Sequence, residues 1–366
     1  MRSERSHRES APRRPRASGG FLALFDADRP PVGLAPMAGF TTPAFRTLAV
    51  REGASFTTTE LVSAKGLRHD PDVRRAARFL VPTEGDAPWG IQLFGHEPED
   101  FRWAVARLLS DARWASCAFI DLNMGCPAPK VVRAGAGCAL MRDPEQVRRI
   151  VEATVDAARA FDVPVTVKMR SGIDARSIDA PDVARAAVAG GASAVTVHGR
   201  TLDQFYAGQA DWHVIARVRE AIPDTPLLGN GDVATREDLR AILAATGCDG
   251  VQIGRAARGN PFVFSRLMSS EDAGDASEQR MLRSVSSERW LRTMTEQLDR
   301  TIDLLGEDVA VREMRASFAF YLKGYPGAVG DRRDVMRPTT REGVLAVLER
   351  AARRRTTGCD AEDALP

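Results

Sequence analysis

Eight short apolar runs, separated by longer segments of helical period, occupy the chain between residues 31 and 264. Short runs of this kind are typical of buried parallel strands, and the segments between them repeat apolar residues at the spacing of amphipathic helices. Eight strand–helix units in about 235 residues predict a closed (β/α)8 TIM barrel, an α/β fold, more than a doubly wound sheet. The expected strands are residues 32–36, 54–59, 89–94, 118–123, 163–169, 193–198, 226–230 and 250–254.

The flanking regions divide the rest of the chain. Residues 1–19 are rich in Arg, Ser and Pro and poor in apolar side chains, so we expect a disordered basic tail. Polar and acidic residues at 269–285 indicate a linker or insertion, after which helical period returns. We therefore predict a catalytic barrel over residues 20–268, a small C-terminal helical domain over 286–355 and a C-terminal tail over 356–366.

Composition argues against a membrane protein and favours a reducing compartment. Hydrophobic residues make up 44% of the chain, yet no apolar run approaches the roughly 18 residues of a membrane span. The five cysteines form no CxxC pair and no apolar secretory segment opens the chain, so we expect free thiols in the cytoplasm. The net charge is only +2, so any nucleic-acid surface must be a local patch. No metal is expected, because the histidines stand in no ligand spacing with the cysteines, and no protein partner is evident.

The residues that follow the apolar runs are those that a barrel places in its active site, since the carboxyl ends of the strands carry the chemistry in this fold. A turn of small residues at 35–39 follows the first run, and glycine-rich turns follow the seventh and eighth. The polar or reactive residues at the other ends are Gln92, Asn123, Cys126, Lys168, Arg170 and His198.

The glycine-rich turns at 230–232 and 254–255 are expected to bind a phosphate through their backbone N–H groups. Ordinary turn chemistry is the alternative for either turn alone. A phosphate site beside Lys168, Gln92 and the turn at Pro36 outlines a bed for a planar phosphorylated cofactor, and flavin mononucleotide (FMN) fits it. An ammonium at Lys168 would stabilise the negative charge of reduced flavin. A Schiff-base lysine of an aldolase and a salt-bridged rim residue are the alternatives for this position.

Cys126 lies in a Gly-Cys-Pro turn at the end of the fourth run, where its side chain is expected to point into the site. An unperturbed thiol is mostly protonated at pH 7 and can serve as a general acid. The usual fate of a free cysteine is a small buried hydrophobe, which is our interpretation of Cys117, Cys138 and Cys248.

Several motifs that occur together in this order resemble the tRNA-dihydrouridine synthases. The resemblance covers roughly residues 33–264, more weakly 311–337, and is nearest to the bacterial type B branch. The motifs are residues 35–39, 121–127 with Lys130, 168–170, 198–201 with Tyr206 and 210–212, 230–232, and 253–256.

The resemblance implies FMN-dependent reduction of the C5=C6 bond of uridines in tRNA to 5,6-dihydrouridine. Hydride would pass from flavin N5 to C6 and a proton from Cys126 to C5, with NADPH or NADH reducing the flavin again. The barrel would bind FMN and the helical domain tRNA. The substrate contacts implied are Asn123, Arg170, Arg315 and Lys323. The FMN contacts implied are Pro36, Met37, Ala38, Gln92, Lys168, His198, Asn230, Gly231, Asp232, Gly254 and Arg255.

Three other functions stay open at this point. A flavin reductase of a free pyrimidine or enone, similar to dihydroorotate dehydrogenase, would need no basic helical domain, whereas residues 306–355 carry eleven basic and seven acidic residues. A barrel that binds RNA without catalysis would not need Cys126 and Lys168. An aldolase-type barrel would bind phosphate without flavin.

Overall fold

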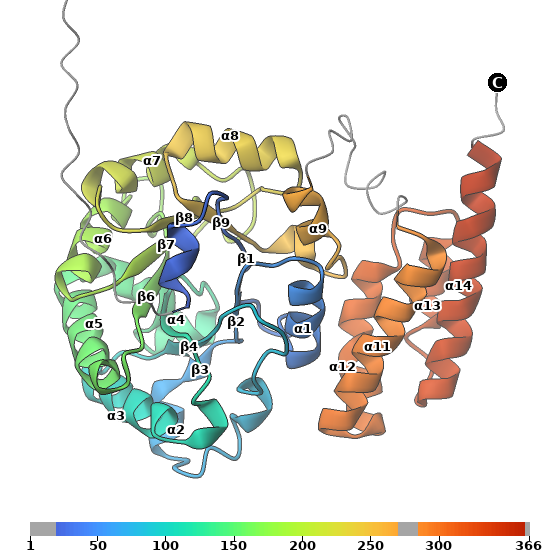
Figure 1. Ribbon diagram of the computed structural model, residues 1–366, viewed down its shortest axis with the longest axis horizontal. Coiled ribbons are helices and arrows are strands. Elements are labelled where there is room, and N and C mark those ends of the chain that lie inside the picture. The colour runs from blue at the N-terminus through green and yellow to red at the C-terminus, as the bar shows by residue number, and fades with distance from the viewer. Residues whose placement is uncertain (1–19, 270–284, 363–366) are drawn as a thin grey trace, which may run out of the picture.

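The computed structural model describes residues 20–269 and 285–362, with side chains described as far as residue 355. The expected basic tail at 1–19 and nearly all of the expected linker at 269–285 lie outside the described residues. The chain forms a ring of strands enclosed by helices, with a second group of helices at one side (Figure 1). Within the described ranges, no helix is long and apolar enough to cross a membrane.

Eight parallel strands close into a barrel, as predicted. Each strand pairs with the next along the chain, β1 pairs with β9 across the closure, and β2 pairs with β4. The strands are β1 (Val32–Leu34), β2 (Thr57–Thr58), β4 (Trp89–Phe94), β5 (Phe119–Met124), β6 (Val165–Arg170), β7 (Ala194–His198), β8 (Leu227–Asn230) and β9 (Gly250–Ile253). The sequence did not predict β3 (Val62–Ser63), a short strand that pairs with the end of β4.

The helices around the barrel start where local capping signals stand. Thr235 and Asp238 form a capping box at the start of one helix, and proline occupies the first turn of several others. The helices are α1 (Pro43–Arg51), α2 (Ala64–Arg68), α3 (Pro98–Leu109), α4 (Pro129–Arg133), α5 (Pro144–Ala158), α6 (Ala180–Ala189), α7 (Trp212–Ala221), α8 (Arg236–Thr246) and α9 (Val263–Met268). The short 3-10 helices are η1 (Leu22–Phe25), η2 (Ala77–Phe79), η3 (Ala112–Trp114), η4 (Gly137–Arg142), η5 (Arg159–Phe161) and η6 (Arg255–Ala257).

The helical region after the barrel has a hydrophobic core of its own. Its helices are α11 (Ser287–Leu305), α12 (Glu307–Tyr321), α13 (Ala328–Asp334) and α14 (Arg341–Glu362). Trp290, Met294 and Phe318 lie at the centre of this core, fully or almost fully buried. The boundary expected at residue 355 is wrong, because α14 continues to Glu362. Its buried apolar positions run on to Ala351 and Ala352, and extending an existing helix costs little.

An aromatic cluster fills the lower interior of the barrel. Phe21, just before η1, stacks on Phe119 with ring centroids 4.1 Å apart and meets Phe56 edge-on at 5.2 Å. Two glycines make room for these rings: a Cβ on Gly33 would lie 2.2 Å from the Phe56 ring, and one on Gly90 would lie 2.3 Å from the Phe119 ring. The cluster fills this part of the interior with apolar rings, and the hydrogen-bonded layer of Gln92, Asp121 and Thr166 lies nearer the carboxyl ends of the strands.

The helical region is attached to the barrel beside the predicted active site. Phe40, in the loop after β1, packs edge-on against Phe320 of α12 at 5.2 Å, and the Arg258 guanidinium lies 4.3 Å from the Phe320 ring centre. Ion pairs surround this contact: Arg51–Glu296, Arg289–Glu52 at 2.6 Å, Arg78–Glu313 at 2.6 Å and Arg300–Glu84 at 2.8 Å. Exposed pairs contribute little singly. We therefore assign most of the attachment to side-chain packing, which comprises the Phe40–Phe320–Arg258 contact and Phe262 of the barrel, a member of the core of the helical region.

We predict that Gly90→Ala lowers the free energy of unfolding by about 2–3 kcal/mol, because the new methyl group must displace the packed Phe119 ring. Urea denaturation measures the change. Gly330→Ala is the matched control: it adds the same methyl group in a helix with nothing within 4 Å, so stability should stay equal or rise. Equal stability of the two variants would show that the barrel interior is not packed as described.

Candidate active site

Polar side chains occupy the barrel interior above the aromatic cluster, in layers set by strand register. Gln92, Asp121 and Thr166 stand opposite one another on β4, β5 and β6. Two residues further along, Asn123 of β5 stands opposite Lys168 of β6. Because alternate residues of a strand face the same side, the second layer lies directly above the first, toward the carboxyl ends of the strands. The structure therefore brings these predicted residues together.

A directed chain of hydrogen bonds runs from Asp121 to the turn of Cys126. The Gln92 side-chain amide donates to Asp121 Oδ2 at 2.7 Å, and Asn123 Nδ2 donates to Gln92 Oε1 at 2.9 Å. Asn123 Oδ1 in turn accepts the backbone N–H of Cys126 at 2.9 Å. An ionised carboxylate can only accept hydrogen bonds, so Asp121 fixes the orientation of both amides. The predicted ligand contact Asn123 thus holds the Cys126 turn in place.

Lys168 extends from β6 toward β8. Its ammonium donates to Asn230 Oδ1 at 2.9 Å, and Asn230 Nδ2 donates to the Gln252 carbonyl at 2.7 Å. Burial lowers the pKa of Lys168, and the nearby Asp121 carboxylate opposes that change. Lys168 therefore lies beside the glycine-rich turn at 230–232.

Cys126 is half-buried at the end of β5. Burial raises the pKa of its thiol above the ordinary value, and the Ala128 backbone hydrogen bond and the Arg170 charge only partly oppose this. The thiol is therefore neutral at pH 7 and able to donate a proton. Cys117, Cys138 and Cys248 are buried, which confirms the prediction that they are core residues.

Arg170 braces two loops at the mouth of the barrel. Its guanidinium donates to the Gly125 carbonyl at 2.9 Å, the Thr201 carbonyl at 2.8 Å and the Phe205 carbonyl at 2.7 Å. The residue is only 2% exposed. The sequence indicated a residue facing the flavin or the base. The contacts show a side chain that ties the Cys126 turn to the loop after β7.

Asp232 joins the glycine-rich turns through two arginines. Its carboxylate accepts from Arg200 Nη2 at 2.7 Å and from the Ala210 N–H at 2.7 Å, and it also binds Arg255. Sequence reasoning gave no role to Arg200, which is 1% exposed. Its place in the motif after β7 was visible, but its partner Asp232, in the turn after β8, was not.

His198 lies at the end of β7, against the turn after β8. A Cβ on Gly231 would lie 3.0 Å from the imidazole ring. Burial, with the charges of Lys168 and Arg170, strongly lowers the pKa of His198. The imidazole is therefore neutral, and it can donate or accept a hydrogen bond without adding charge.

Two buried polar atoms of the barrel strands leave hydrogen-bonding capacity open for a ligand. Thr58 Oγ1 and Gln252 Oε1 are buried and have no hydrogen-bond partner among the described residues. Gly254 brings three elements together, since a Cβ there would touch Met37 Sδ at 3.9 Å and Asn230 Nδ2 at 4.0 Å. Gln252 Oε1 can only accept a hydrogen bond, so it suits an N–H group of a ligand ring and not a phosphate. The groups that could bind a phosphate are the backbone N–H groups of the turns at 230–232 and 254–255, with Met37 of the β1 turn at their edge.

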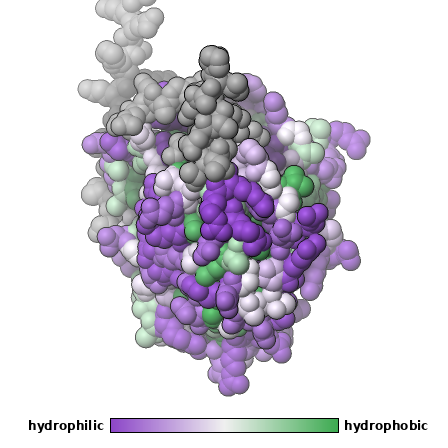
Figure 2. Space-filling view, turned by 90° about the vertical axis from the view of Figure 1, so that its right-hand side faces the viewer, coloured by the Kyte–Doolittle hydropathy of each residue, from purple (hydrophilic) through white to green (hydrophobic). Residues whose placement is uncertain are grey.

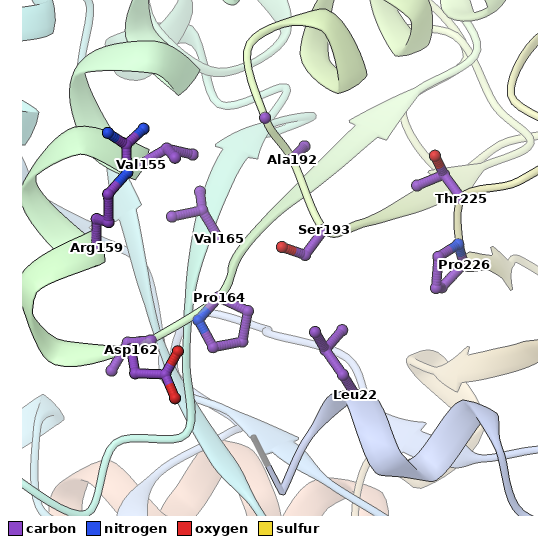
Figure 3. A pocket seen from close by; sticks show the side chains of 12 residues that line it. Leu22, Val155, Arg159, Asp162, Pro164, Val165, Ala192, Ser193, Thr225 and Pro226 are labelled. Carbon is purple, nitrogen blue, oxygen red and sulfur yellow. The ribbon is translucent and has the colours of Figure 1, made fainter. Parts of the chain in front are cut away.

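A separate cavity of about 410 Å³ lies at the opposite end of the barrel. Leu22, Pro164, Ser193 and Pro226 line it at the amino-terminal ends of β6, β7 and β8, with Arg159 at its rim (Figure 3). Barrels carry their chemistry at the other end of the strands. We therefore assign no reaction to this cavity.

The proposed RNA contacts of the helical region differ in exposure. Arg315 is half-buried and donates to the Pro338 carbonyl at 3.2 Å, so it holds α12 to the segment before α14. Lys323 directly follows α12, near the Phe40–Phe320 contact, and Arg333 is 73% exposed. Figure 2 shows that the outer side of the helical region is mostly hydrophilic.

Comparison with known proteins agrees with this site. A family model described as "Dihydrouridine synthase (Dus)" matches residues 33–357. The chain belongs to the dihydrouridine synthase family. A "Probable tRNA-dihydrouridine synthase" of Rhizobium leguminosarum is 41% identical over 81% of this chain and 87% of its own length. One of Mycobacterium tuberculosis H37Rv is 37% identical over 87% and 82%, and the "tRNA-dihydrouridine synthase B" of Xanthomonas campestris is 36% identical over 87% and 91%.

These matches confirm the resemblance drawn from the sequence motifs, including its link to type B relatives. In this member of the dihydrouridine synthase family, the matched span contains the whole barrel site and continues through α12 and α13 into α14. The barrel and the helical region are thus parts of one family architecture.

We predict that Cys126 reacts slowly with iodoacetamide at pH 7, because its raised pKa leaves little thiolate. The difference in alkylation rate between the unmodified chain and Cys126→Ala isolates this thiol from the other four cysteines of the chain. The rate should still rise with pH above the pKa of an ordinary thiol. A midpoint below about 8.5, the value of an ordinary thiol, would contradict the burial described.

Proposed function

We propose that this chain reduces the C5=C6 bond of uridines in tRNA to 5,6-dihydrouridine, with FMN as its cofactor. The observation that carries the proposal is the placement of a protonated Cys126 thiol and the Lys168 ammonium at the ends of adjacent strands, in a chain of this family. We place the activity in the cytoplasm, a reducing compartment in which a free thiol persists.

Residues at the carboxyl ends of the strands would hold the cofactor. When bound, FMN supplies the hydride that reaches C6, after reduction by NADPH or NADH. The Lys168 ammonium would balance negative charge at the flavin ring, and Gly231 and Gly254 would offer backbone N–H groups to the phosphate. The proposed FMN set is Pro36, Met37, Ala38, Gln92, Lys168, His198, Asn230, Gly231, Asp232, Gly254 and Arg255.

Within that set, Asp232 acts through its neighbours. A carboxylate next to a phosphate would repel it, but the Asp232 charge is neutralised by Arg200 and Arg255. The pair of arginines leaves a net positive charge at the turn. Arg255 is 39% exposed, so its guanidinium can reach a ligand at the mouth.

Cys126 would deliver the proton to C5 of the uracil base. The chain from Asp121 holds the backbone of its turn, and Arg170 holds the turn from the other side. Both contacts fix the thiol relative to the ends of the strands. General acids placed in this way contribute about 10²–10⁴-fold to a rate.

The tRNA would present a uridine turned out of its stack, because the C5=C6 bond cannot be reached inside a folded loop. Two basic residues of the helical region would bind phosphates. They are Lys323, at the end of the region nearest the mouth, and Arg333, on its exposed surface. Arg315 would act by holding α12 in place.

We predict that Cys126→Ala keeps its bound FMN but forms dihydrouridine at least about 100-fold more slowly, because only the proton donor is lost. Flavin absorbance and dihydrouridine in digested tRNA are the two measurements. Cys248→Ala, in the core away from the mouth, is the matched control and should stay active. Purified protein without flavin absorbance would refute the cofactor assignment. Reduction of free uracil, but not of tRNA, would favour the free-pyrimidine reductase.

We predict that reversing Lys323 and Arg333 to Glu weakens tRNA binding and flattens its dependence on salt. Two lost phosphate contacts should reduce the log–log slope by about 1.4–1.8. Binding measured across a salt series tests this, with Arg159→Glu at the far end of the barrel as a control for a charge reversal away from the helical region. If the double variant binds as the unmodified chain does, the helical region does not bind the RNA backbone.

A further inference from the structure

Asp121 is a buried acid beneath the site, and so far its carboxylate has only been assigned the orientation of the amides below Cys126. It is 1% exposed and lies one layer below Lys168 and Asn123. Thr166 Oγ1 donates to its Oδ1 at 2.6 Å and Gln92 Nε2 to its Oδ2 at 2.7 Å. Both donors are neutral. Burying a carboxylate is costly, and neutral donors leave its charge without an ion-pair partner in contact.

Lys168 is also a buried charged group with a neutral hydrogen-bond partner, but its charge is positive. Its hydrogen-bond partner is the neutral Asn230 amide. The charged groups whose fields act on it are Asp121 on β5 and Arg170 on its own strand, and His198 on β7 is neutral. Arg170 repels an ammonium, so Asp121 is the anion that faces it.

We propose that Asp121 is a positioning residue whose carboxylate supplies the negative charge that balances the Lys168 ammonium. The effect of Lys168 on a bound cofactor rests on the proposed function. The balance of charge between Asp121 and Lys168 does not. Without that charge, burial and Arg170 would both favour the neutral amine. A neutral amine cannot oppose negative charge on a ligand, so Asp121 would act on the ligand through Lys168.

The sequence offers a direct way to test this. The chain has four lysines, namely Lys65, Lys130, Lys168 and Lys323. In protein grown with [ε-13C]lysine, the carbon signal of each side chain shifts as its amine ionises. The signal absent from Lys168→Met identifies Lys168. The titration uses the full chain without flavin or RNA, so it stays informative even if the proposed function fails.

Asp121→Asn should lower the Lys168 pKa by about one to two units, as expected for unit charges roughly 6–8 Å apart at an effective dielectric constant of about 20. The other three lysine signals serve as internal controls. Asp249 directly precedes β9, at the amino-terminal end of the strand. Asp249→Asn makes the same change of charge there and should leave the pKa of Lys168 unchanged.

An unchanged Lys168 pKa in folded Asp121→Asn would overturn the proposal, and so would an equal shift in Asp249→Asn. If Asp121→Asn does not fold, the unmodified chain still decides. Interacting groups titrate together, so the Lys168 signal should show a second, smaller step at lower pH that reports Asp121. A single step would overturn the proposal.

Discussion

Closure of the barrel by β1 and β9 is the interaction on which the site depends. Val32, Gly33 and Leu34 pair with residues 251–253, more than 200 positions later in the chain. This pairing sets the small turn after β1 beside Gly254 and the turn after β8. Each strand lies parallel to its neighbours, so every intervening unit must be in register before the first and last loops meet. The cofactor bed is therefore a property of the closed ring.

The interior of the barrel is aromatic toward the amino-terminal ends of the strands and polar toward their carboxyl ends. Phe21, Phe56 and Phe119 fill the lower part, and the hydrogen-bonded layer of Gln92, Asp121 and Thr166 lies above them. Polar groups in such a place must find partners, and here the partners form an ordered chain. Because a carboxylate accepts and never donates, Asp121 determines which way the amides above it point. A charge at the centre of the barrel thus organises the turn that carries the proposed proton donor.

The helical region meets the barrel at the loops that would hold the cofactor. Phe40 belongs to the loop after β1 and Arg258 to the loop after β9, and both contact Phe320 of α12. A Cβ on Gly259 would lie 2.5 Å from the Tyr321 nitrogen, so the two backbones are in close contact. The surface proposed to bind RNA and the proposed flavin bed therefore share one packed cluster. A shift of α12 would move both.

The barrel and the candidate groups at its strand ends could be predicted from the sequence alone, because period, glycine turns and strand ends are local patterns. Eight strands, and Cys126 and Lys168 at their ends, could be read in this way. The hydrogen-bond partners of these side chains could be identified only in the folded structure. In the structure, Arg170 donates to loop carbonyls and Arg200 to Asp232, and Arg315 is half-buried. The structure also contains β3 and α13, which the sequence did not predict, and α14 continues to Glu362. Those outcomes depend on which distant groups barrel closure and helix packing bring within hydrogen-bonding distance, and no local spacing records that.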